Sequence, residues 1–277
     1  MHFSEKEIKK VIFPLIEAIL KNYTSNKTLL VGIGGGQGTG KTSLVKYIES
    51  DLRERGYRVT SFSLDDFYLS WRDRQDLALK YPDNPFYQIS RGMPGTHRVT
   101  DLFKALQRAK AGRPFTIPIF DKSLYHGAGD IARKTLRVRT KQDIILFEGW
   151  CLGIPLASSQ ELKKACQHHR IPLSKIDPTL KYHQTVLSLA ATYQKIWKLL
   201  NYMVMLKPDS GTLHFHWRWR QERELRKRTG KGMNQAEVEK FVSLYLPFTY
   251  LCYDKIRSDM LVKINRKHEF YRLQYYS

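Results

Sequence analysis

A run of apolar residues that leads into a glycine cluster constrains this chain more than any other feature. Residues 29–48 read LLVGIGGGQGTGKTSLVKYI, so that an apolar strand over 29–33 precedes a glycine-rich turn and a helix starting at Lys41. Residues 35–42 have the spacing G-x-x-x-x-G-K-[ST]. A strand before this spacing and a helix after it distinguish a phosphate-binding loop from an ordinary glycine turn. The segment therefore predicts an α/β fold that holds a nucleotide.

The residues of this loop have separate expected roles. Glycines let successive backbone N–H groups point inward at phosphate oxygens, and the start of the following helix adds a partial positive charge. Lys41 can reach the β- and γ-phosphates, and the hydroxyl of Thr42 can bind Mg²⁺. We expect a nucleoside triphosphate to be held by Gly35, Gly36, Gln37, Gly38, Thr39, Gly40, Lys41, Thr42 and Ser43.

The order of the other patterns predicts the fold class. Short apolar strands over 29–33, 58–64, 144–147 and 203–206 alternate with helices over 41–55 and 100–111. Such alternation is typical of parallel βαβ units with helices on both faces. We expect a three-layer α/β/α fold with a mostly parallel sheet, in a single domain spanning 1–277. We expect an amphipathic helix over 1–27, connections that bind the substrate over 68–139, and a helical region at the C-terminus.

Composition narrows the class of protein. Lys and Arg number 47 against 26 Asp and Glu, a formal charge of +21; this attracts anions, or is simply a solvated basic surface. The absence of a run of 18 apolar residues argues against a membrane span. Three widely spaced cysteines without a Cys-x-x-Cys pair argue against disulfides and zinc and favour a reducing cytoplasm.

Two carboxylates follow the second predicted strand, in SLDDFYLS at 63–70. Open α/β sheets bind ligands at the carboxyl ends of their strands, where a carboxylate can accept a proton from an attacking hydroxyl. We favour Asp65 as this base, although Asp66 and a simple helix-capping role remain open.

A third carboxylate ends the strand in DIILFEGW at 143–150. An acidic residue in this place usually organises Mg²⁺ or its water shell, so Glu148 is expected to be a metal ligand with Thr42. Asp143 begins the same strand at its far end and is expected to be structural.

Six segments together resemble D-glycerate 3-kinase of the plant and cyanobacterial type, within the group of phosphoribulokinase, uridine kinase and pantothenate kinase. They are GGGQGTGKTS, SLDDFYLS, RGMPGTH, IPIFDKSLYHGAGD, ILFEGWCLG and WRWRQE, spread over residues 28–250. The resemblance implies ATP and Mg²⁺ as cofactors, Asp65 as base, Glu148 at the metal, and an Arg-rich lid helix at 212–232. The chain departs from the family at Arg98, after PGTH, and at Ile131, after Asp130. These departures bear on which acceptor is phosphorylated more than on whether the chain is a kinase.

Glycerate is a small anion with two hydroxyls, so its site requires a cation and several hydrogen-bonding groups. Arg91 or Lys122 could bind the carboxylate, Arg in bidentate geometry and Lys as a point charge. The candidate substrate-binding residues are Asp66, Tyr68, Arg91, His97, Asp121 and Lys122, with Tyr125 and Asp130 in the same connections.

The predicted lid over 212–232 carries Arg218 and Arg223 as candidates to meet the phosphates. Pairs at i, i+4, such as Arg218 with Glu222, would make much of this helix an ordinary salt-bridged surface. Arg223 has no acid one turn away, so its charge is the freest to act catalytically on the transferring phosphoryl group with Lys41 and Asp65. Trp217 and Trp219 are expected to pack rather than to stack on a base.

The sequence is therefore consistent with three functions. The first is phosphorylation of D-glycerate to 3-phosphoglycerate, and the second is the same chemistry on a nucleoside or pantothenate-like alcohol. The third is a basic nucleic-acid-binding NTPase, which the +21 charge suggests but which no RNA-binding aromatic motif supports. We expect a small-molecule substrate as the partner and no membrane.

Overall fold

The structure is a computed structural model that describes residues 3–88, 91–173, 177–230, 232–256 and 258–275. In this part of the chain a six-stranded sheet forms the centre of the molecule, in the order β2-β5-β1-β6-β7-β8. The first five strands are parallel, and β8 runs antiparallel to β7. The strands are β1 (Leu29–Gly35), β2 (Val59–Ser63), β5 (Ile144–Gly149), β6 (Tyr202–Pro208), β7 (Met260–Ile264) and β8 (Phe270–Tyr275).

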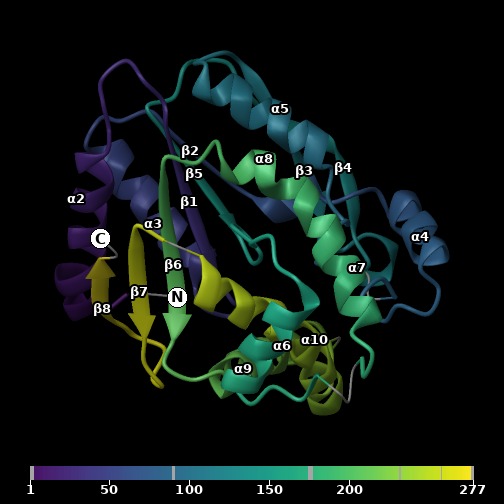
Figure 1. Ribbon diagram of the computed structural model, residues 1–277. Helices are drawn as coiled ribbons and strands as arrows, with labels where there is room; N and C mark the ends of the chain where they lie inside the picture. The colour runs from purple at the N-terminus through teal and green to yellow at the C-terminus, as the bar shows by residue number, and fades with distance from the viewer. Residues whose placement is uncertain (1–2, 89–90, 174–176, 231, 257, 276–277) are drawn as a thin grey trace.

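Helices cover both faces of this sheet and bury two apolar cores, as Figure 1 shows. One core packs α2 (Phe13–Lys21) and α3 (Lys41–Glu54) against the sheet. The other face carries α5 (Val99–Lys110), α6 (Ser159–His168), α7 (Lys181–Ala190), α8 (Gln194–Trp197) and α10 (Gln235–Lys255). The three-layer arrangement with a mostly parallel sheet is the predicted one.

The N-terminal periodicity corresponds to one continuous helical run that includes a π-helical turn. It begins with a capping box in which Ser4 and Glu7 satisfy each other's backbone N–H groups. It continues through α1 (Glu5–Glu7), the π-turn η1 (Ile8–Ile12) and α2. Glu7 also accepts a hydrogen bond from the backbone N–H of Phe270 at 3.0 Å, which ties this helix to β8.

The connections contain more regular structure than the sequence predicts. A helix, α4 (Trp71–Lys80), lies between residues 68 and 95, and residues 118–139 belong largely to a hairpin of β3 (Phe115–Asp121) and β4 (Asp130–Val138). The hairpin was not predicted from the sequence, because residues 133–137 of β4 are exposed on both faces and so lack the apolar alternation that marks a strand. Similarly, the predicted C-terminal helical region ends at Lys255 and is followed by β7 and β8. The apolar run of β7 is only five residues long, too short for periodicity to assign.

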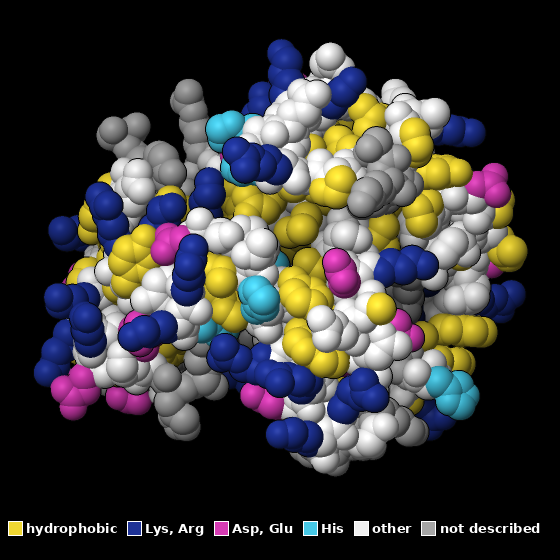
Figure 2. Space-filling view, turned by 90° about the horizontal axis from the view of Figure 1, so that it is seen from below, with side chains coloured by type: hydrophobic (Ala, Val, Ile, Leu, Met, Phe, Trp, Pro, Cys, Tyr) yellow, Lys and Arg dark blue, Asp and Glu magenta, His cyan; other side chains and the backbone are white. Residues whose placement is uncertain are grey.

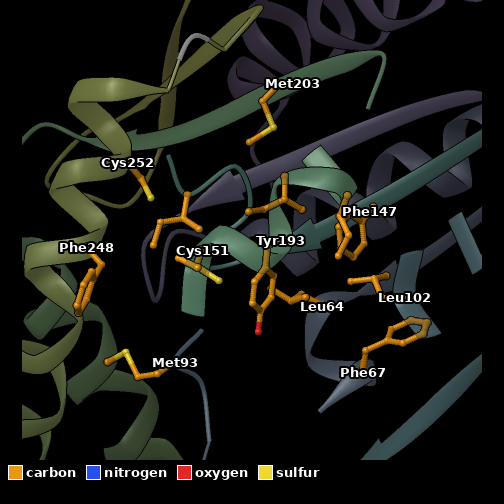
Figure 3. Close-up of a cluster of buried hydrophobic side chains, with 14 of the residues drawn as sticks. Leu64, Phe67, Met93, Leu102, Phe147, Cys151, Tyr193, Met203, Phe248 and Cys252 are labelled. Atoms are coloured by element: carbon orange, nitrogen blue, oxygen red, sulfur yellow. The ribbon is translucent and has the colours of Figure 1, made fainter. Parts of the chain in front are cut away.

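The core beneath the ends of β2 and β5 supports the segments that follow these strands (Figure 3). Phe147 of β5 packs against Phe62 of β2 with ring centroids 5.1 Å apart, and Tyr193 is fully buried in the same cluster. All three cysteines are buried free thiols. Among the described helices, none has the length and apolar character needed to cross a membrane.

A central-strand substitution tests this packing. Leu146 of β5 is fully buried between β1 and β2, so Leu146→Ala should lower the free energy of unfolding by about 2–5 kcal/mol. Leu156→Ala, at a side chain that is 63% exposed, should change it by less than about 0.5 kcal/mol. Urea denaturation followed by circular dichroism measures both, and equal effects of the two substitutions would contradict the assigned core.

Candidate active site

The phosphate-binding loop lies between β1 and α3, at the carboxyl edge of the sheet. Gly38 and Gly40 have φ values of +74° and +86°, in the left-handed region that favours glycine. Gly36 is required for another reason, because a Cβ atom there would lie 2.1 Å from Cε1 of His214. The glycines at 36, 38 and 40 thus permit both the turn and its close packing.

Lys41 is folded back onto its own loop. Its ammonium donates to the carbonyl oxygens of Gly35 and Gly36, both at 2.9 Å. Burial lowers the pKa of Lys41, while the nearby carboxylate of Glu148 acts in the opposite direction. A triphosphate would offer this buried ammonium stronger partners than two neutral carbonyls.

Thr42 and Glu148, the two candidate metal ligands, are in contact. The hydroxyl of Thr42 donates to Oε1 of Glu148 at 3.0 Å. Burial raises the pKa of Glu148, and the charge of Lys41 opposes this shift. Hydroxyl and carboxylate oxygens are the hard ligands that Mg²⁺ prefers, so the pair fits a magnesium ion at the edge of the triphosphate site.

The two carboxylates after β2 have different environments. They lie on the short 3-10 helix η2 (Leu64–Phe67). Asp66 caps this helix, accepting the backbone N–H of Ser63 at 2.9 Å, and burial raises the pKa of Asp66 to about 6. Asp65 instead accepts from Lys122 at 2.7 Å and from the hydroxyl of Tyr68 at 2.9 Å.

The charge of Asp65 is stabilised by these two partners. Burial by itself raises the pKa of Asp65, but the ammonium of Lys122 and the hydrogen bonds from Lys122 and Tyr68 outweigh it and hold the pKa below the ordinary value. Asp65 is therefore ionised at neutral pH. Of the two carboxylates, Asp65 has the side chain that is free of a capping role.

The side chain of His97 is buried and packs against Tyr68. Its ring stacks on the ring of Tyr68 with centroids 4.5 Å apart, and its Nδ1 is hydrogen-bonded to the hydroxyl of Tyr193 at 2.7 Å. Burial lowers the pKa of His97 to about 4, so the ring is neutral. Its Nε2 has no hydrogen-bond partner within the described residues.

The remaining substrate candidates gather around the turn between β3 and β4. Arg91 donates to the carbonyls of Gly127 and Ala128, both at 2.7 Å. Asp130 accepts the backbone N–H groups of Trp71 and Ile131, and Tyr125 stacks on Trp71. Asp121 accepts hydrogen bonds from the backbone N–H and from the hydroxyl of Ser123. These contacts stabilise the turn itself, whereas Lys122 extends from it to Asp65.

Arg74 is a residue of this region that sequence reasoning missed. It is 4% exposed and donates to the carbonyls of Leu69, Ala128 and Gly129, next to Arg91. Its position depends on α4, which the sequence did not reveal. The signal that could have found it is Ser70, which caps α4 by accepting the N–H of Asp73.

The predicted lid corresponds to α9 (Thr212–Thr229); residue 231 of the predicted range lies outside the described part. Arg218 pairs with Glu222, which is only 3% exposed. Arg223 has no carboxylate partner within the described chain, and its guanidinium lies 5.9 Å from the ring centroid of Trp219. Trp217 is 2% exposed and packs in the core. Figure 2 looks onto the end of the molecule that carries α9 and shows many Lys and Arg side chains with few carboxylates between them.

Comparisons with known proteins agree with this geometry. The chain is 33% identical over 226 residues to a protein of Schizosaccharomyces pombe named uncharacterized kinase mug58, covering 80% of this chain and 79% of the relative. The chain belongs to the P-loop kinase group that includes D-glycerate 3-kinase. It is also 30% identical to the chloroplastic D-glycerate 3-kinase of Arabidopsis thaliana, over 79% of this chain and 46% of that protein.

This P-loop kinase also shares its fold with a solved structure. D-glycerate 3-kinase from Cryptococcus neoformans superposes with a TM-score of 0.83 at 24% identity, covering 96% of each chain. A scan against protein-family models found no match. The chain is an ATP-dependent kinase.

The different environments of the two carboxylates generate a prediction. Asp65→Asn should reduce kcat by about 10²–10⁴, the range for a lost general base, with little change in ATP affinity. Asp66→Asn is the matched control, because an asparagine can still cap η2, and its kcat should stay within about threefold of wild type. Steady-state kinetics with calorimetric ATP binding measures both. A large loss confined to Asp66→Asn would transfer the role of base to Asp66.

Proposed function

We propose that this P-loop kinase transfers the γ-phosphoryl group of ATP to D-glycerate and forms 3-phosphoglycerate. The observation that carries the proposal is the 2.7 Å ion pair between Asp65 and Lys122. It combines a carboxylate able to accept a proton with a cation able to bind a carboxylate. The name of the Arabidopsis relative supports the same acceptor.

The proposed ATP site is formed by the loop residues from Gly35 to Ser43. Lys41 would exchange its two carbonyl contacts for phosphate oxygens. Thr42 and Glu148 would hold Mg²⁺, which supplies charge neutralisation on the phosphates when bound. Burial raises the pKa of Glu148, and a cation bound beside it would favour its charged form.

The proposed base is Asp65. It accepts the proton of the primary hydroxyl as the oxygen attacks the γ-phosphorus, and the P–O bond to ADP breaks in line. Tyr68 orients the carboxylate through its 2.9 Å hydrogen bond. His97 supports Tyr68 by stacking on its ring.

Lys122 is the cation we assign to the carboxylate of the acceptor. Its side chain is 58% exposed and moves at little cost, whereas Arg91 is already engaged by two carbonyls. Arg91 is assigned to holding the β3–β4 turn, together with Asp121. Asp66 is assigned to fixing η2, and thereby Asp65.

The proposed lid residues are Arg218 and Arg223. Arg223 lacks a carboxylate partner among the described side chains, so it is the one that we expect to meet the transferring phosphoryl group. Closure of α9 would also exclude water from the reaction. For the location of the enzyme we propose the cytoplasm, since its three thiols are free; the Arabidopsis relative is chloroplastic.

Acceptor specificity tests this proposal. If a cation of the site binds the carboxylate of the substrate, that cation stays unpaired when an uncharged analogue such as glycerol binds. The value of kcat/KM for D-glycerate should therefore exceed that for glycerol by about 10² or more. Lys122→Met should remove most of this preference and raise the KM for glycerate more than the KM for ATP. Coupled ATPase assays with glycerate, glycerol, uridine and pantothenate measure the preference.

Lys134→Met is the control, because Lys134 is an exposed lysine on β4 of the same hairpin. It should leave both KM values within about twofold of wild type. Preferred turnover of uridine or pantothenate would reject glycerate and keep the kinase. Salt-sensitive retention on RNA without stimulation by any acceptor would favour a nucleic-acid-binding NTPase.

A further inference from the structure

Side chains from three parts of the chain are hydrogen-bonded to backbone carbonyls of the phosphate-binding loop. The carbonyls of Gly35 and Gly36 accept from Lys41. The carbonyl of Gln37 is hydrogen-bonded to Nδ1 of His214 at 2.9 Å. The carbonyl of Gly38 is hydrogen-bonded to Nε2 of His268 at 2.6 Å. Four consecutive carbonyls are thus occupied by side chains of α3, α9 and the turn between β7 and β8.

These contacts fix where the loop amides point. In a trans peptide the C=O of one residue and the N–H of the next point in opposite directions. Holding the carbonyls of Gln37 and Gly38 outward therefore directs the N–H groups of Gly38 and Thr39 inward. The backbone N–H groups of residues 37–40 have no hydrogen-bond partner among the described residues, which leaves them available for phosphate oxygens.

His268 is held in place for this contact. It lies in the β7–β8 turn with φ of +69°, and its ring stacks on Trp217 of α9 with centroids 4.2 Å apart. Burial lowers the pKa of His268, and the hydrogen bond to Gly38 opposes the shift. A carbonyl can only accept, so Nε2 must carry the proton.

We propose that His268 is a positioning residue of the ATP site and that the C-terminal hairpin β7–β8 is thereby part of the nucleotide-binding machinery. The Gly38–Thr39 peptide follows a glycine at φ +74°, where the backbone has unusual freedom. The imidazole removes this freedom before ATP arrives. The inference rests on ATP binding by the loop and is independent of the identity of the acceptor.

The test compares two nearly isosteric substitutions, His268→Gln and His268→Met. Both lose the aromatic ring and both carry the same backbone cost at positive φ, but only glutamine retains an N–H donor at the position of Nε2. Lys267→Ala, an exposed neighbour in the same turn, is the control. The Kd for ATP is measured by calorimetry without any acceptor, together with kcat, both KM values and the melting temperature of the ligand-free protein.

We expect His268→Met to weaken ATP binding about tenfold, as for a buried carbonyl left without a donor. The KM for ATP should rise in parallel, while the KM of the acceptor stays unchanged. His268→Gln should recover most of the affinity, and Lys267→Ala should match wild type.

Equal ATP affinities of the Met variant and wild type would overturn the proposal. So would equally weak binding by the Gln and Met variants, because the hydrogen bond would then not be the cause. If the Met variant proves unfolded, His268→Ala replaces it as the donor-free member of the pair, with the same two outcomes. The Kd for ATP is measured without an acceptor, so it stays valid even if D-glycerate is not phosphorylated. Failure of the glycerate assignment is therefore distinguished from failure of this proposal.

Discussion

The parallel pairing of β1 with β5 and β6 determines where the other parts of the site lie. Parallel strands end at the same edge of a sheet, and the register places Glu148 of β5 beside Ile33 of β1 and Ser63 of β2. The phosphate-binding loop, the carboxylate of Glu148 and the segment that carries Asp65 therefore start from one row of residues. Few further contacts are needed to bring three chemical functions together.

Two groups of contacts then organise the site. On the nucleotide side, Lys41 contacts the carbonyl of Gly35, and His214 and His268 hold the carbonyls of Gln37 and Gly38, which we propose directs the N–H groups of Gly38 and Thr39 toward the phosphates. On the acceptor side, the turn between β3 and β4 carries Lys122 to Asp65. Lys41, Asp65, Lys122 and Glu148 each already have a hydrogen-bond partner, and we propose that ATP and the acceptor bind by replacing these partners.

The sequence predicted what depends on local pattern. The glycine spacing and the alternation of short apolar strands with helices were sufficient for the fold, and the strand-end carboxylates indicated Asp65 and Glu148 as candidate site residues. The β3–β4 hairpin and β7 were missed because their exposed or short strands lack a period that distinguishes them. The contact of His268 with Gly38 joins residues 230 positions apart. No local pattern encodes such a contact, and the same holds for the pairing of Lys122 with Asp65.

The central claim is that Lys122 controls the charge of Asp65, the proposed base, and the pH dependence of kcat/KM tests it most directly. A base of this kind acts only when ionised, so activity is kept above its pKa and is lost as the pH falls through it. Because Lys122 holds that pKa below its ordinary value, the acidic limb that belongs to Asp65 should lie below the range of an ordinary aspartate in the wild type. Without the ammonium, burial dominates, so Lys122→Gln should show a limb at distinctly higher pH. An acidic limb at the same pH in both enzymes would contradict the account.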